Sequence, residues 1–166
     1  DDAPRTSKFE AAIRRRLGAA AGGEMTVVDI GTGPFALLAV MAARAGARRV
    51  YALEKNPEAA AKAREAVARL GFENKVQVIE GDSMAIELPE RVDLVVSELI
   101  GSIATQEGVA PIIRDAESRF LKPDRVASGM IPQRCETCVA PIFYRGRGLW
   151  ARLLAPRDGL RSRGRP

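Results

Sequence analysis

The sequence contains no histidine and only two cysteines, Cys135 and Cys138. A structural zinc site needs four ligands, usually Cys or His, and this C-x-x-C pair lacks the partners that would complete one. The segment around the pair has the composition of extended chain, in which residues three apart point to opposite faces. We therefore predict no metal site, and two ordinary thiols are typical of a reducing compartment.

Long hydrophobic runs are also missing. No apolar stretch approaches the ~20 residues needed to cross a bilayer, and no signal peptide is visible, so we predict no membrane partner. The chain begins at Asp1 rather than Met, which predicts a fragment or a processed form. Its 166 residues, 46% of them hydrophobic and 28% charged, suit one globular domain with its own core.

Positive charge is concentrated at one end of the chain. Residues 142–166 contain seven arginines and one aspartate, a net +6 that exceeds the +5 of the whole chain, so residues 1–141 sum to −1. The body of the chain therefore lacks the basic footprint of a nucleic-acid-binding domain. Arg, Gly and Pro dominate the tail, which predicts a flexible solvated segment or one held by a partner.

The most informative stretch is TVVDIGTGPFALL, residues 26–38. A short apolar run leads to Asp29, and then come Gly31 and Gly33, which can adopt backbone angles closed to other residues. Pro34 suits the first position of the helix that follows. The pattern predicts a strand, a glycine turn and a helix whose first N–H groups point at a ligand in the turn.

Apolar periodicity predicts that strands and helices alternate along the rest of the chain. Such alternation favours right-handed crossovers and a parallel sheet with helices on both faces, which is an α/β fold. A further helix precedes the first strand, with Phe9, Ile13 and Leu17 on one face. The predicted helices cover about 2–17, 35–45 and 58–70, and the predicted strands cover 25–30, 49–54, 75–80 and 91–97.

Carboxylates follow the predicted strands. Asp29 ends the first strand, Asp82 follows the third, and Glu54 ends the second, about 20 positions after Gly33, a spacing expected for a carboxylate on a ribose. Three carboxylates at one crevice would repel a pyrophosphate but suit a ligand with a sulfonium, an ammonium and a ribose diol, such as S-adenosylmethionine. The alternative is that all three are solvated strand ends.

Three other charged residues are candidates for the same crevice. Arg5 lies on the side of its helix that carries Phe9, and it either pairs with a ligand carboxylate or is a solvated surface charge. Glu98 follows the fourth predicted strand, and Glu107 lies beyond a loop that can bring the two together. Two carboxylates could bind a planar guanidinium, whereas the alternative makes Glu107 a solvated loop residue.

These segments together resemble the protein arginine N-methyltransferases over residues 2–142. DAPR followed by Phe9 resembles the N-terminal segment of that family, VVDIGTGPF its motif I, and YALEKNP its post-I motif. Glu98 and Glu107 match its double-E loop. The GPF turn and SELIGS are most similar to the branch that makes symmetric dimethylarginine.

The resemblance implies a Rossmann-like class I methyltransferase domain over 1–141, in which 1–23 form a helix and linker that cover the cofactor. It implies S-adenosylmethionine as cofactor and methyl transfer to arginine guanidinium nitrogens of RG-rich protein substrates. A scaffold subunit that keeps the fold and the cofactor pocket without turnover is the alternative. The implied roles are Arg5 for the cofactor carboxylate, Asp29, Gly31 and Gly33 for the methionine and turn region, Glu54 for the ribose, Asp82, Ser83 and Met84 for the adenine, and Glu98 and Glu107 for the substrate guanidinium.

The resemblance also bears on the C-terminal end. It implies that the chain stops at the start of a β-barrel, so residues 142–166 are either a truncated barrel or an Arg/Gly/Pro-rich tail. A partner chain could complete the barrel or hold the tail, and the RGR pieces make self-methylation conceivable. The resemblance favours the cytoplasm or nucleus, and a processed organellar form stays open.

Overall fold

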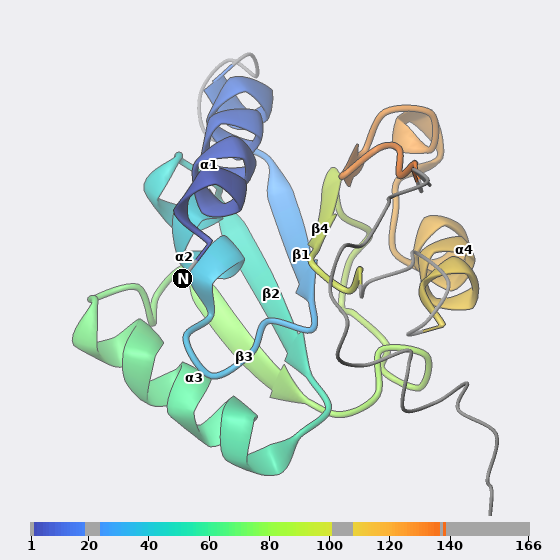
Figure 1. Cartoon of the computed structure of the whole chain (residues 1–166). Coiled ribbons are helices and arrows are strands. Elements are labelled where there is room, and N and C mark those ends of the chain that lie inside the picture. The colour runs from blue at the N-terminus through green and yellow to red at the C-terminus, as the bar shows by residue number, and fades with distance from the viewer. Residues whose placement is uncertain (1, 19–23, 101–107, 137, 139–166) are drawn as a thin grey trace, which may run out of the picture.

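The computed structural model describes residues 2–18, 24–100, 108–136 and 138. Its centre is a parallel five-stranded sheet with the strand order β3-β2-β1-β4-β5. The predicted α/β architecture is confirmed, because helices cover both faces of this sheet (Figure 1). The elements are α1 (Ala3–Gly18), β1 (Thr26–Ile30), α2 (Leu37–Arg44), β2 (Arg49–Glu54), α3 (Pro57–Arg69), β3 (Val76–Glu80), β4 (Leu94–Ser97), α4 (Val109–Arg119), the short 3-10 helix η1 (Pro123–Arg125) and β5 (Met130–Ile131).

The sheet changes direction of growth at β1. This strand pairs with β2 on one side and with β4 on the other, and Asp29 lies beside Ala52 and Val96 in the two registers. The chain thus builds outward to β3 first and then returns to the other side of β1. In open α/β sheets, ligands bind at such a switch point, outside the carboxyl ends of the strands.

Two apolar clusters follow from the alternation of side chains along the strands. On one face α1, α2 and α3 pack against the sheet, and on the other face α4 and the segment after it do so (Figure 1). The first cluster is represented by Ile13, Leu17, Val27, Val50, Val67 and Leu94, and the second by Val28, Leu53, Val95, Ala116, Phe120 and Leu121.

The N-terminal helix is close to its prediction. Ile13 and Leu17 are buried in the first cluster, and Phe9 is partly buried against it. The helix α4 was not predicted, although it carries Ala116 into the second cluster. No described helix has the length and apolar character required to span a membrane. The predicted barrel start and the 142–166 tail lie outside the described residues.

Two predicted boundaries were wrong. Helix α2 begins at Leu37, because Ala36 adopts a left-handed conformation with φ 46° and interrupts the helical turn before it. Pro34 therefore lies in the turn and does not occupy the first helical position. Strand β4 begins at Leu94, later than predicted, and Val92 forms only an isolated bridge within the described part of the chain.

Candidate functional site

The turn between β1 and α2 is held against β2 by the backbone. The N–H groups of Gly31 and Thr32 both donate to the carbonyl of Leu53, at 2.9 and 3.0 Å. Gly31 has φ +72°, and a Cβ added there would lie 2.6 Å from Cδ2 of Leu99. Gly33 has φ +66° with nothing within 4 Å of such a Cβ. Gly31 is therefore required by both conformation and space, and Gly33 by conformation alone.

Asp29 links this turn to the start of α2. Its Oδ2 accepts hydrogen bonds from Oγ1 of Thr32 and from the N–H of Ala39, in the first turn of α2. Asp29 thereby caps the helix, since Ala36 at the N-cap has no side-chain acceptor. Sequence analysis did not single out Thr32, although a hydroxyl three residues after an aspartate is a usable local signal.

The carboxylate of Asp29 is poorly compensated by the protein. The residue is only 1% exposed, and its Oδ1 has no hydrogen-bond partner in the described structure. Burial, with a further contribution from the charge of Glu54, raises the pKa of Asp29 to about 7, although Thr32 and Ala39 oppose the shift. The site therefore contains a buried acid near its titration point, which a cationic ligand would favour in its charged form.

Glu54, at the end of β2, accepts hydrogen bonds from the glycine turn after β1 and from the start of the segment that leads into α3. Its Oε2 accepts from the N–H of Gly33 at 2.9 Å, and its Oε1 accepts from the N–H of Asn56 at 2.8 Å. The carbonyl of Glu54 in turn accepts from Gly81 at 2.9 Å. Each carboxylate oxygen has a second lone pair, so Glu54 can accept from ligand hydroxyls while it holds the turn.

Arg5 and Glu98 meet across 93 positions of sequence. Nη1 of Arg5 lies 2.9 Å from Oε1 of Glu98, and its Nε lies 3.2 Å from Oδ2 of Asp2. The Arg5 side chain is 52% exposed and that of Glu98 35% exposed, so the pair lies at the mouth of the site. The residue predicted for the cofactor and the residue predicted for the substrate are therefore in direct contact.

Asp82, Ser83 and Met84 form the turn after β3. Oδ2 of Asp82 accepts from Nζ of Lys55 at 2.8 Å, and its Oδ1 accepts from the N–H of Met84 at 3.0 Å. The hydrogen bond from Lys55, followed by that from Met84, holds the pKa of Asp82 below its usual range. Met84 is 50% exposed, which leaves an apolar side chain beside the turn for a flat ligand to contact.

Arg119 of α4 reaches back to this turn and was missed by sequence analysis. Its Nη2 donates to the carbonyl of Ser83 and its Nη1 to that of Ile86, each at 2.6 Å. Asp115 receives two hydrogen bonds from the same guanidinium, which stacks 4.7 Å from the ring centroid of Phe120. The Asp115–Arg119 spacing is a helical i,i+4 pair, but nothing local indicated that the turn after β3 was its target.

A cavity of about 230 Å³ is lined by half of the predicted site residues. It is bounded by the glycine turn, the start of α1 and the end of β4, and exposed Phe35 and Leu37 also line it. Glu54 adjoins it through Gly33, whereas the turn after β3 lies outside the lining. Glu107 is not among the described residues. The predicted residues that line the cavity are Arg5, Asp29, Gly31, Gly33 and Glu98.

The charges of this cavity define what it can bind. The carboxylates of Asp29 and Glu98 line it and that of Glu54 accepts from Gly33 of the turn, whereas Arg5 is the one cation among its described lining residues. Such an arrangement suits a ligand with positive groups and one carboxylate. The two cysteines are exposed thiols away from it, and no cluster of three potential metal ligands occurs in the described ranges.

Comparison with known proteins places the chain in a family. The model of the PRMT5 arginine-N-methyltransferase family matches residues 7–128. Protein arginine N-methyltransferase PRMT10 of Arabidopsis thaliana is 40% identical over 70% of this chain and 29% of its own length. Protein arginine N-methyltransferase 5 of Oryza sativa subsp. indica is 37% identical over 71% of this chain and 18% of its own length. The chain therefore spans less than a third of either relative.

The fold agrees with that placement. A solved structure of the Trypanosoma brucei PRMT1 enzyme–prozyme heterotetrameric complex with AdoHcy matches with a TM-score of 0.69 and 31% identity, covering 75% of this chain and 38% of that one. The predicted Rossmann-like methyltransferase sheet is thus confirmed for the described residues. Since the family model covers most of its length, this chain belongs to the PRMT5 arginine-N-methyltransferase family.

Proposed function

We propose that this chain binds S-adenosylmethionine and transfers its methyl group to arginine side chains of protein substrates. The observation that carries the proposal is the acidic cavity at the switch point of the sheet, which Asp29 and Glu98 line together with the glycine turn. Family membership supports the same chemistry. Because the chain is much shorter than its relatives, we extend activity, substrate and partners to it as proposals.

The protein groups around the cavity fit this cofactor. In the described structure Asp29 has a buried oxygen without a partner, and Gly31 in the same lining has no room for a Cβ, which would lie 2.6 Å from Cδ2 of Leu99. The cavity, at about 230 Å³, is smaller than the ~300–1,000 Å³ typical of whole ligand sites. We therefore assign the amino-acid and ribose part of the cofactor to it and the adenine to the turn after β3.

Each predicted residue has a role in that arrangement. Arg5 would bind the cofactor carboxylate, a charge-assisted contact. The acids near the glycine turn would accept from the ammonium and the ribose hydroxyls, and the turn after β3 would contact the adenine amine and ring. The cofactor residues so assigned are Arg5, Asp29, Gly31, Gly33, Glu54, Asp82, Ser83 and Met84.

Glu98 would bind the substrate guanidinium together with Glu107. The contact between Glu98 and Arg5 supports this role, because it shows that the carboxylate is accessible to a guanidinium at 2.9 Å. When bound, the cofactor supplies a methyl group that its sulfonium charge already activates. The two glutamates would orient the guanidinium and draw its positive charge away from the attacking nitrogen. Prior deprotonation is not required, which matters because the guanidinium of arginine stays protonated in proteins.

A scaffold subunit is the second candidate, and one observation favours it. The Arg5–Glu98 ion pair occupies the carboxylate that a substrate would need, so a chain that kept this pair with cofactor bound would not turn over. The similar trypanosome structure is an enzyme–prozyme complex, so a supporting role within an assembly is compatible with this fold. We propose, in addition, a partner chain that completes the region beyond residue 141, with residues 1–141 as the cofactor-binding unit.

Calorimetry with S-adenosylmethionine followed by a methyl-transfer assay on an RG-rich peptide tests both candidates. For Glu98→Gln we expect cofactor affinity to stay within about threefold and transfer to fall by about 100-fold or more, since one charge that orients the acceptor is lost. Glu73→Gln, an exposed glutamate outside the cavity, is the matched control. Cofactor binding without transfer by the unaltered chain would favour the scaffold, and no cofactor binding would reject both.

A further inference from the structure

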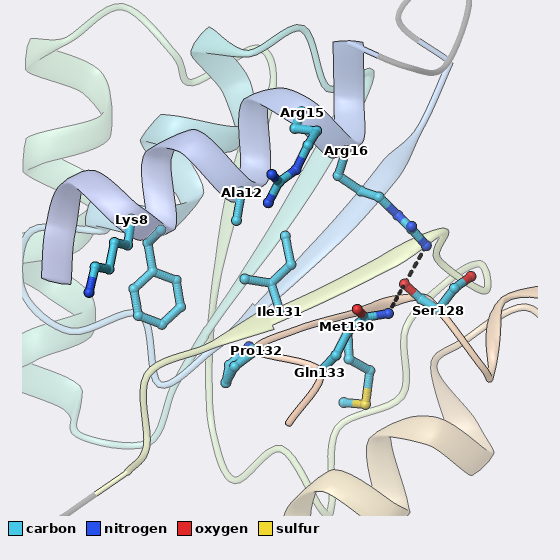
Figure 2. Close-up of a pocket in the computed structure, with 10 residues that line it drawn as sticks. Lys8, Ala12, Arg15, Arg16, Ser128, Met130, Ile131, Pro132 and Gln133 are labelled. Atoms are coloured by element: carbon cyan, nitrogen blue, oxygen red, sulfur yellow. Dashed lines mark hydrogen bonds between the residues drawn. The ribbon is translucent and has the colours of Figure 1, made fainter. Parts of the chain in front are cut away.

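A second groove, of about 440 Å³, lies between α1 and the edge strand β5 (Figure 2). Its floor is apolar and is formed by Phe9 and Ala12 of the helix, and by Ile131 and Pro132 at the end of the sheet. Figure 2 shows Ala12 projecting toward Ile131. Apart from Phe9, which also faces the acidic cavity, the two linings share no described residue. This groove is therefore a separate feature.

The rim of the groove is positively charged. Lys8, Arg15 and Arg16 line it, and no carboxylate does so among the described residues. Arg16 donates to the carbonyl of Ser128 across the groove (Figure 2). Lys8 and Arg15 have no ion pair within the described structure, whereas Arg14, on a neighbouring face of the helix, pairs with Glu10 at 2.8 Å. The uncompensated charge is thus directed at the groove.

The edge of β5 adds backbone hydrogen-bonding groups. Met130 pairs with Val95 in a parallel register, and the N–H of Val95 donates to the carbonyl of Gly129 at 2.7 Å. In that pattern the N–H and C=O of Met130 itself point away from β4, toward the side of β5 on which no described strand lies. The Met130 side chain belongs to the second apolar cluster and points away from α1 (Figure 2). Met130 therefore presents main chain to the groove.

We propose that this groove binds an extended segment of another polypeptide in which apolar and acidic residues alternate. The apolar side chains would lie against Ala12 and Ile131, the carboxylates would meet Lys8 and Arg15, and the segment would pair with Met130 as an added strand. The N–H and C=O of Met130 would fix the direction in which the segment binds, while apolar burial and charge would supply most of its affinity. The chain's own 142–166 tail, at net +6, carries the wrong charge for this rim.

The test is fluorescence anisotropy with a labelled peptide in which Glu alternates with Ile, compared with a peptide in which Lys replaces Glu. We expect the chain to bind the Glu peptide, and Lys8→Glu/Arg15→Glu to weaken that binding by about tenfold, as two attractive contacts become repulsive. The same double variant should gain affinity for the Lys peptide. Arg14→Glu is the matched control, because it reverses a charge on the same helix outside the groove and should leave affinity unchanged.

Two further measurements address folding and the apolar floor. Circular dichroism melts check that each variant is folded, and Ala12→Trp should abolish binding by filling the groove from the helix side. A backbone N-methylated Glu peptide should bind more weakly, because it loses the pairing with Met130, and equal binding would exclude strand addition. Equal binding of the Glu and Lys peptides, or equal loss in Arg14→Glu and Arg15→Glu, would overturn the proposal. So would self-association in sedimentation experiments that Arg15→Glu abolishes, because a second copy would then occupy the groove.

Discussion

Asp29 and Asp93 are two buried aspartates at opposite ends of the neighbouring strands β1 and β4. Asp29 is 1% exposed at the carboxyl end of β1, and Asp93 is 5% exposed just before β4. Asp93 accepts from the N–H of Thr26 at 2.9 Å and from Nζ of Lys122 at 2.8 Å. Although burial opposes the shift, these bonds hold the pKa of Asp93 below its usual value, whereas the pKa of Asp29 is raised.

The difference lies in where the compensating charge comes from. At the amino end of β4, two side chains of the chain itself compensate the charge of Asp93. Nζ of Lys122 lies 2.8 Å from its Oδ1, and Nε of Arg125 lies 3.8 Å from the same oxygen. At the carboxyl end of β1, Asp29 accepts hydrogen bonds from a hydroxyl and a backbone N–H, and no described cation contacts it. A buried charge left without a partner is costly, so an uncompensated acid indicates a site for an external cation. This difference supports our proposal that the functional site lies at the carboxyl ends of the strands.

The largest effect should come from Asp93→Asn. It removes the charge that compensates Lys122 and Arg125, and we expect the free energy of unfolding at pH 7 to fall by about 3 kcal/mol. Because the pKa of Asp93 is lowered on folding, its contribution is present above pH ~4 and is lost as the pH falls below that value. Urea denaturation at pH 7 and pH 3 measures this, and an undiminished difference at pH 3 would contradict the assignment.

Two glycines, one after the carboxyl end of β1 and one before the amino end of β3, offer a second comparison. Gly31 and Gly71 have nearly equal φ angles, +72° and +73°, but only Gly31 has an atom within 4 Å of an added Cβ. We expect Gly71→Ala to cost about 1 kcal/mol through backbone strain and Gly31→Ala to cost about 2 kcal/mol, since Leu99 must also move. Thermal melts compare the two, and equal losses would show that Leu99 moves without cost.

Asp29→Asn should have the opposite pH dependence to Asp93→Asn. The raised pKa of Asp29 means that the folded state binds the proton more tightly, so wild-type stability falls as the pH rises from about 4 to about 7. The variant lacks this titration, and we expect it to be about 1 kcal/mol more stable than wild type at pH 8, yet to bind S-adenosylmethionine less tightly. Denaturation across this pH range and calorimetry measure both; a stability difference that is constant with pH would show that Asp29 does not titrate there.

The smallest effect concerns Arg119, which orders the turn after β3. Arg119→Lys keeps the charge but loses the fork that contacts Ser83 and Ile86, and we expect cofactor affinity to fall by about threefold. Exposed Arg114→Lys on the same helix is the control. Methionine-end analogues that lack the adenine should bind both variants equally, and an equal loss for these analogues would indicate a general structural defect instead of a role at the adenine turn.

Much of the scaffold followed from local patterns. The strand and glycine turn at residues 26–33, the buried stripe of Ile13 and Leu17, and the alternation of strands with helices were all correct, because each depends on residues a few positions apart. The start of α2 was not predictable in this way, since Ala36 at its N-cap offers no side-chain acceptor and the N–H of Ala39 is capped by Asp29, ten residues earlier.

The sequence by itself determined the elements and the acidic character of the strand ends, because apolar periodicity, glycine and charge act over neighbouring residues. The tertiary structure alone decided which of these charges meet. The order of the strands brings Glu98 to Arg5 and leaves Asp29 without a contact to any described cation, and the packing of α4 brings Arg119 to Ser83. Those contacts cross tens of residues, and they depend on how the helices pack on the two faces of the sheet, which no local pattern specifies.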